Sequence, residues 1–135
     1  MSNYPRILCV DDDKDTCEMI RMMLWQADYR CSVKSAFTIE EALNYIETES
    51  FDLYILDYRM PNMTGIDLCS LIRKTDKQTP IMFFTAMARD IDRKSATIAG
   101  ANEYLIKPND LDRLVETIKD LLCQSALDTL NRKVA

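Results

Sequence analysis

The sequence predicts an α/β fold: a doubly wound parallel sheet of five strands with five helices, in the flavodoxin-like order 2-1-3-4-5. Four short, continuous apolar runs are separated by helical patterns, which is typical of parallel strands buried on both faces. A further segment alternates polar and apolar residues, as an edge strand does. Neither repeats nor low-complexity segments interrupt the alternation of strands and helices, which indicates one domain.

The first strand and helix are predicted from residues 7–10 and the pattern that follows them. Asp13 stands at the position of a helix N-cap. The apolar face of this helix would be formed by Cys17, Ile20, Leu24 and Ala27. Residues 30–34 alternate polar and apolar side chains and predict the edge strand.

Caps and turn signals mark the next helices and the strand between them. Thr38 and Glu41 form a capping-box pattern. The inward side chains of that helix would be Ile39, Leu43 and Ile46. The apolar run 53–56 predicts a buried strand, and the turn signals of residues 60–65 lead into another helix. Its apolar side chains would be Leu68, Leu71 and Ile72.

The rest of the chain predicts two more strands and two more helices. Residues 81–84 and 104–106 are apolar runs, and residues 89–99 form a helical pattern that ends at Gly100. A final apolar stripe is formed by Leu111, Leu114, Ile118, Leu121 and Leu122. We expect one domain over residues 1–123 and a C-terminal extension over 124–135 that is helical or frayed.

The composition agrees with one globular domain and argues against several classes of function. The 135 residues are 47% hydrophobic and 29% charged, which is ordinary for such a domain. No stretch has the length of a membrane span, and the first residues lack the basic and apolar regions of a signal peptide. The net charge of -5 argues against a nucleic-acid surface, because phosphate contacts need clustered Lys and Arg.

The chain has five cysteines and no histidine. The cysteines show no C-x-x-C spacing and mostly fall among apolar residues, which favours reduced core thiols and a reducing compartment such as the cytoplasm. The lack of histidine excludes histidine-based catalysis and histidine metal ligands.

Each of the four apolar strands ends at polar side chains. Asp11 and Asp12 follow the first strand, Asp57 follows the second, and the others end at Thr85 and Lys107. Because open α/β sheets bind ligands at the carboxyl ends of their strands, these groups should converge on one rim. Each also has a structural explanation, as a helix cap, a turn contact or a lysine that reaches solvent. Taken together, the four strand ends favour one site.

The chemistry of this set is that of a metal-dependent phosphoryl site. Three carboxylates repel one another, so a cation must join them or some must be protonated. Oxygen ligands without histidine select a hard ion, and Mg²⁺ fits best. A phosphoryl group that bridges the metal, the Lys107 ammonium and the Thr85 hydroxyl would complete the site. A carboxylate would then be the nucleophile.

The motifs around these groups occur in a characteristic order. They are Val10-Asp11-Asp12, Leu56-Asp57 with Met60-Pro61 and Gly65, Thr85-Ala86, and Ala99-Gly100-Ala101 through Tyr104 to Lys107-Pro108. Together they resemble the response-regulator receiver domain of two-component signalling, collinearly from about residue 6 to residue 122. The chain looks most like the stand-alone receivers of the chemotaxis and sporulation type.

The resemblance implies a phosphoacceptor and a set of metal ligands. Asp57 would take the phosphoryl group. Asp12 and Asp57 would bind Mg²⁺ directly, and Asp11 would bind it through water. The backbone carbonyl of Arg59 would complete the protein's share of the ligands.

The resemblance also implies a conformational switch. Lys107 would contact the phosphoryl group, and its peptide bond to Pro108 would be cis. Thr85 would turn its hydroxyl toward the phosphoryl group and free the space into which Tyr104 rotates. The surface over the last two helices and the strand between them would change as a result.

Partners follow from the same resemblance. The phosphoryl donor would be a sensor histidine kinase or a histidine phosphotransfer protein, and the target a downstream protein. We expect no direct contact with nucleic acid, no membrane insertion, and a monomer or a weak phosphorylation-dependent dimer. Residues 124–135 are too short for an output domain. The protein would catalyse its own phosphorylation and slow dephosphorylation without being a turnover enzyme.

Three other classes of protein are alternatives. The Asp11-x-Asp13 spacing resembles haloacid-dehalogenase phosphatases, although a cap insertion and a later acidic pair are missing. A calcium loop through Asp11, Asp13 and Asp15 fails because Thr16 and Met22 occupy the positions that require Gly and Glu. A pseudo-receiver that acts only as an interaction module is opposed by the complete set of site residues.

Overall fold

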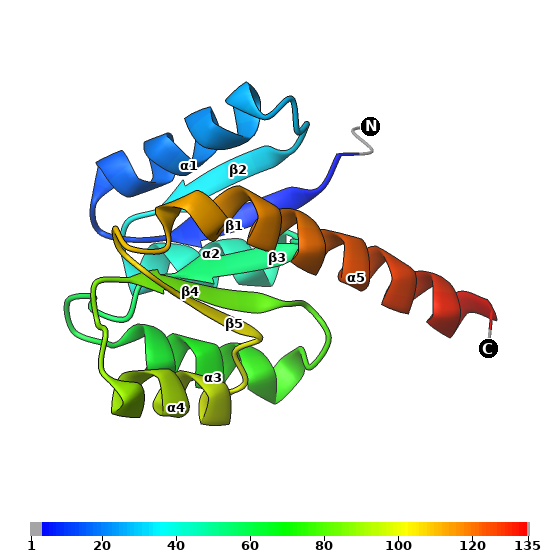
Figure 1. The fold of residues 1–135 in the computed structure, drawn as a ribbon. Coiled ribbons are helices and arrows are strands. Elements are labelled where there is room, and N and C mark those ends of the chain that lie inside the picture. Colours follow the sequence, from blue (N-terminus) through cyan, green and yellow to red (C-terminus); the bar gives the residue numbers. More distant parts are fainter. Residues whose placement is uncertain (1–3, 135) are drawn as a thin grey trace.

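The computed structural model describes residues 4–134, and the predicted fold class is confirmed. Five parallel strands form one sheet in the order β2-β1-β3-β4-β5, with helices on both sides of it (Figure 1). The elements are β1 Arg6–Val10, α1 Lys14–Gln26, β2 Ser32–Ala36, α2 Ile39–Thr48, β3 Leu53–Leu56, α3 Gly65–Thr75, β4 Ile81–Thr85, α4 Asp90–Ala99, β5 Glu103–Ile106, a 3-10 turn Leu111–Arg113, and α5 Leu114–Val134.

Alternate residues of the buried strands face two separate cores. In β1, Ile7 and Cys9 pack in the core that α1 and α5 cover. Leu8 and Val10 pack in the other core, against α2, α3 and α4. Since successive side chains of a strand point to opposite faces, a strand that is covered on both sides must be apolar throughout. This explains the continuous apolar runs of the sequence.

The edge strand β2 lies two residues later than predicted. It spans Ser32–Ala36 rather than residues 30–34, and Arg6 of β1 pairs with Ser32. The alternation of polar and apolar side chains has a period of two, so a strand that begins at residue 30 and one that begins at residue 32 fit the pattern equally well. The end of β2 is instead fixed by long-range pairing, in which the Asp11 amide donates to the Ala36 carbonyl over 3.1 Å.

Two details of the predicted helices are wrong. Ala27 is exposed, because α1 ends at Gln26 and Ala27 is its C-cap. Thr38 caps α2 as expected, by accepting from the Glu41 amide over 3.1 Å. The Glu41 carboxylate, however, accepts from the Phe37 amide, one residue before the cap, over 2.7 Å. The predicted N-cap at Asp13 and the left-handed C-cap at Gly100, with φ of 115°, are both confirmed.

Helix α5 continues past residue 123 as far as Val134. Figure 1 shows this end of α5 projecting past the sheet. Leu127 and Leu130 lie in the projecting part and are exposed. No helix within residues 4–134 combines the length and the apolar character that crossing a membrane would need.

Candidate functional site

Three carboxylates meet at the carboxyl edge of the sheet. Asp11 and Asp12 follow β1, and Asp57 follows β3. The two strands are paired neighbours, and the Asp57 amide donates to the Val10 carbonyl over 3.0 Å. One carboxylate oxygen from each of the three aspartates lies within 4.8 Å of the others. The predicted convergence of the three carboxylates is therefore observed.

The loop after Asp57 is held by a close backbone approach at Gly65, the first residue of α3. The Gly65 amide donates to the Tyr58 carbonyl over 2.9 Å. A Cβ at position 65 would lie 2.0 Å from the Asp57 carbonyl oxygen, so only glycine fits there. Thr64 and Asp67 then form a capping box that starts α3. The turn signals of residues 60–65 thus fix the position of the Asp57 backbone.

Lys107 reaches the acidic cluster from the end of β5. Its ammonium lies 2.7 Å from Asp11 Oδ2 and 3.6 Å from Asp57 Oδ2. It also lies 3.4 Å from the Thr16 hydroxyl oxygen. The Lys107–Pro108 peptide bond is cis, as expected. The structure therefore joins the ends of β1, β3 and β5 through one ammonium group.

The charges in this cluster are not balanced. Three carboxylates lie beside one ammonium, and the Asp11 side chain is 2% exposed. Burial raises the pKa of the Asp57 carboxyl, and the Thr85 hydroxyl only partly opposes this shift. Burial disfavours the charged form of Lys107, but the hydrogen bond and the charge of Asp11 outweigh it, so the pKa of Lys107 is raised. The cluster is therefore suited to a further cation, and its carboxylate oxygens match a hard ion such as Mg²⁺.

Thr85 and Tyr104 are connected through one residue of the β4–α4 loop. The Thr85 hydroxyl accepts a hydrogen bond from the Met87 amide over 3.3 Å. The Met87 carbonyl in turn accepts from the Tyr104 hydroxyl over 2.6 Å. Tyr104 is buried and stacks on Phe83, with 5.8 Å between the ring centroids. It is therefore an inward-facing residue that is connected to Thr85 through the backbone of Met87.

Asp13 and Arg59 lie next to the cluster in the sequence, but their side chains are not part of it. Asp13 lies next to the cluster, but its side chain caps α1 by accepting from the Asp15 amide over 2.9 Å. This role weakens the phosphatase alternative, which needs Asp13 as a second catalytic carboxylate. Arg59 lies in the loop after Asp57 with an exposed side chain, and the metal-binding role of its carbonyl stays a prediction.

Sequence reasoning did not identify Thr16 as part of the site. Its side chain is buried beside Lys107, although it lies in the first turn of α1 and looks like an ordinary helix residue. The sequence carried no signal for this contact, because a threonine in the first turn of a helix is ordinary and its contact with Lys107 depends on how α1 packs against the sheet.

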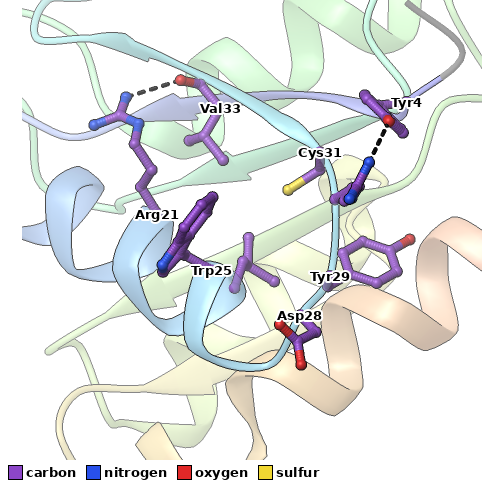
Figure 2. Close-up of a pocket in the computed structure, with 9 residues that line it drawn as sticks. Tyr4, Arg21, Trp25, Asp28, Tyr29, Cys31 and Val33 are labelled. Carbon is purple, nitrogen blue, oxygen red and sulfur yellow. Dashed lines mark hydrogen bonds between the residues drawn. The ribbon is translucent and has the colours of Figure 1, made fainter.

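A hollow that is not lined by the acidic cluster lies elsewhere. It measures about 670 Å³ and is shown in Figure 2. Trp25 borders it near the end of α1, roughly 18 Å along the helix from Asp13. Its two arginines are already engaged: Arg21 donates to the Val33 carbonyl over 2.8 Å, and Arg30 donates to the Tyr4 hydroxyl over 2.9 Å. The size of a hollow therefore does not mark the site here.

Comparisons with known proteins agree with this arrangement. The sequence profile of the response regulator receiver domain matches residues 7–119. The transcriptional regulatory protein DltR of Streptococcus agalactiae is 35% identical over 127 residues, which cover 94% of this chain and 56% of that protein. An uncharacterized 14.6 kDa protein of Leptolyngbya boryana is 38% identical over 115 residues, which cover 84% of this chain and 86% of that protein.

Solved structures show the same likeness. A CheY-like response regulator receiver domain protein from Methanospirillum hungatei superposes with a TM-score of 0.84 at 30% identity, covering 93% of this chain and 99% of that one. The receiver domain of the Francisella response regulator 1452 superposes with a TM-score of 0.81 at 28% identity, covering 90% and 98%. The chain spans about half the length of several curated relatives that it matches, such as DltR.

Proposed function

The chain belongs to the response regulator receiver family, whose members signal through phosphorylation, and from that premise we propose that it is a Mg²⁺-dependent switch with Asp57 as its phosphoacceptor. One observation carries the proposal. Three carboxylate oxygens lie within 4.8 Å of one another, beside a single ammonium. Such a site has an excess of negative charge and an acceptor oxygen, which are the two features that metal-assisted phosphoryl transfer to a carboxylate requires.

Four residues would hold the ion, all of them through oxygen atoms. Asp12 and Asp57 would hold Mg²⁺ directly, Asp11 through water, and Arg59 through its backbone carbonyl. The bound ion would neutralise negative charge on the carboxylates and on the incoming phosphoryl group. Asp12 is the exposed member of the cluster, which suits a ligand that meets a hydrated ion arriving from solvent.

Phosphorylation would form one bond and break one bond. A carboxylate oxygen of Asp57 attacks the phosphorus atom of the donor, and the bond from phosphorus to the donor's nitrogen or oxygen breaks. The product is an acyl phosphate that carries about -1.5 to -2 charges. Lys107 lies 3.6 Å from Asp57 Oδ2 and would shift from Asp11 to the new phosphoryl oxygens.

The signal would leave the site through Thr85. When the Thr85 hydroxyl turns to the phosphoryl group, the Met87 amide loses its acceptor. Met87 also holds the Tyr104 hydroxyl through its carbonyl, so the β4–α4 loop and Tyr104 would adjust together. Arg93 of α4 donates to the Tyr104 carbonyl over 3.0 Å, which extends this connection to α4. The surface formed by α4, β5 and α5 would then present a different shape to a partner.

The proposed partners are proteins. A sensor histidine kinase or a histidine phosphotransfer protein would supply the phosphoryl group, and a downstream protein would bind the changed surface. The net charge of -5 opposes direct contact with nucleic acid. We place the protein in the cytoplasm, in agreement with its five free cysteines, and expect a monomer or a weak phosphorylation-dependent dimer.

The deciding experiment is intact mass spectrometry after incubation with acetyl phosphate, with and without Mg²⁺. The wild type should gain one phosphoryl group only when Mg²⁺ is present. Asp57→Asn should gain none, because an amide lacks the nucleophilic carboxylate, whereas Asp13→Asn should behave like the wild type. Phosphorylation of Asp57→Asn would place the acceptor elsewhere, and turnover of a generic aryl phosphate would favour a phosphatase instead.

A further inference from the structure

Two cysteine thiols face each other in the core next to the acidic cluster. Cys9 lies in β1, two residues before Asp11, and Cys17 lies in the first turn of α1. The Cys17 thiol donates a hydrogen bond to Cys9 Sγ, and the two sulfur atoms are 2.9 Å apart. Both residues are 1% exposed and belong to the core between α1 and the sheet.

The separation of the two sulfur atoms is close to bonding distance. Bonded sulfur atoms are separated by about 2.05 Å, so the pair would have to close by only about 0.9 Å. Cys69 offers a comparison within the same molecule. It is equally buried, but its thiol lies 3.5 Å from the Ala99 carbonyl oxygen instead of facing another sulfur. The juxtaposition of Cys9 and Cys17 is therefore not a general property of buried cysteines in this fold.

We propose that Cys9 and Cys17 are a redox modification site, which hydrogen peroxide converts into an intramolecular disulfide. The peroxide first oxidises one thiol to a sulfenic acid and releases one water molecule. The second sulfur then attacks the sulfenyl sulfur, the S–S bond forms, and the hydroxyl leaves as a second water molecule. In total, the two thiols lose two electrons and two protons, and the peroxide is reduced to two waters.

The burial of the pair restricts which oxidants reach it. Cys17 lies in the terminal turn of α1, and helix ends open more readily than helix centres. We therefore expect hydrogen peroxide, which is about the size of a water molecule, to reach the pair more readily than a bulky disulfide such as oxidised glutathione. In a reducing compartment the resting form is the dithiol, and the disulfide is a transient, regulatory form.

The disulfide would act on the acidic cluster because of what lies between the two cysteines. The loop closed by the bond contains Asp11 and Asp12, and Thr16 beside Cys17 contacts Lys107 over 3.4 Å. A bond between the two sulfurs would tie β1 to the first turn of α1, and we expect this to shift the groups between them, where displacements of about 1 Å change rates by up to about a hundredfold. We expect phosphorylation by acetyl phosphate to slow at least about tenfold in the oxidised protein. This consequence rests on the proposed function, whereas disulfide formation itself does not.

The test uses a variant of the 135-residue chain with Cys31→Ser and Cys123→Ser, which removes the half-buried and the exposed thiol. After treatment with hydrogen peroxide, its intact mass should fall by two hydrogens, and dithiothreitol should reverse the change. Trypsin cleaves after Lys14, so Cys9 and Cys17 are released in the separate peptides 7–14 and 15–21. A disulfide-linked pair of these two peptides identifies the bond.

Matched variants give the controls. Adding Cys69→Ser should leave the loss of mass intact, whereas adding Cys9→Ser or Cys17→Ser should abolish it. Peptides mapped in the variant that keeps Cys9 and Cys17 decide whether the bond forms, even if substitution of a core cysteine disturbs folding. A bond to Cys69, a gain of oxygen without a linked pair, or no change with peroxide would overturn the proposal.

The same samples separate this inference from the proposed function. A disulfide that forms without slowing phosphorylation overturns the link between the dithiol and the rim, but not the phosphoacceptor. A reduced protein that is never phosphorylated at Asp57 overturns the proposed function, while the linked peptides still establish the modification site.

Discussion

The two ends of the sheet use the same kinds of group in opposite ways. At the carboxyl end, Lys107 lies among carboxylates whose charge exceeds its own. At the amino end, Arg73 donates to the carbonyls of Gly100, Asp76 and Thr79 and to the side-chain oxygen of Asn102, over 2.7 to 3.0 Å. Those partners are uncharged, so the arginine is fully used in joining α3 to the loops before β4 and β5. One cation stabilises the fold, and the other lies in a site that needs a further ligand.

The carboxylates of the two ends differ in the same way. Burial raises the pKa of Asp57 at the carboxyl end. Burial also acts to raise the pKa of Asp76 at the amino end, but hydrogen bonds from Thr79 and Gln78 outweigh it, and the pKa of Asp76 is lowered. A charge that the fold satisfies contributes to stability, whereas a charge left in excess is available for binding. The electrostatic imbalance, and not the volume of the hollow in Figure 2, therefore distinguishes the end that carries the candidate site.

The largest expected effect comes from the two glycines of the chain, one at each end. Gly65→Ala should lower the free energy of unfolding by about 3 kcal/mol or more, because the new Cβ would meet a backbone oxygen that cannot move aside. Gly100→Ala should lower it by a smaller amount, about 1 to 3 kcal/mol, because the new Cβ combines strain at a φ of 115° with contact to the Arg73 side chain, which can shift more readily than a backbone oxygen. Urea unfolding measures both, and a reversed order would contradict the rigid approach of α3 to Asp57.

Removal of the amino-end cation should affect stability without affecting the site. Arg73→Ala leaves several backbone carbonyls without a donor and should lower the free energy of unfolding by about 2 to 3 kcal/mol. The exposed neighbour Lys74→Ala should change it by less than about 0.5 kcal/mol and serves as the control. Calorimetric titration of the folded variants should give the same Mg²⁺ affinity as the wild type. A large change in that affinity for Arg73→Ala would show that the two ends are coupled.

Removal of the Lys107 ammonium should instead change the affinity of the acidic cluster for Mg²⁺. Lys107→Ala takes away a positive charge that competes with Mg²⁺ for the carboxylates, so the affinity for Mg²⁺ should rise about tenfold. Lys107→Arg keeps the charge and should leave the affinity near that of the wild type. Calorimetry is the suitable measurement, because Trp25 is exposed and far from the rim. Weaker binding by Lys107→Ala would mean that the ammonium positions the carboxylates rather than competing for them.

The smallest effect should be the pH dependence contributed by Asp76. Because the pKa of Asp76 is lower in the folded protein than its usual value of 3.8, its ionised form adds stability above that value. This contribution is lost as the pH falls through the lowered pKa. Asp76→Asn should therefore be less stable than the wild type at pH 7, by below about 1 kcal/mol after solvent screening, and the difference should close below about pH 4. A difference that widens on acidification would contradict the assignment.

Sequence patterns predicted the carboxyl end more fully than the amino end. The polar residues of the rim directly follow apolar strands, so periodicity alone placed Asp11, Asp57 and Lys107 at one edge. The amino end gave no comparable signal, because Arg73 lies within a helix and its acceptors are mostly backbone carbonyls. Backbone groups are identical in every residue, so no pattern of residue types reveals which of them a side chain will reach.

The sequence by itself determined the fold class, the number and approximate position of the strands, and the set of chemical groups at their ends. These properties depend on the spacing of apolar residues and on residue type, both of which are local. Only the tertiary structure decided that Thr16 contacts Lys107, that Cys9 faces Cys17, and that Tyr104 is buried against Phe83. Each of these contacts is set by how a helix or strand packs against the sheet, and a shift of a few ångströms would remove it without changing any local pattern.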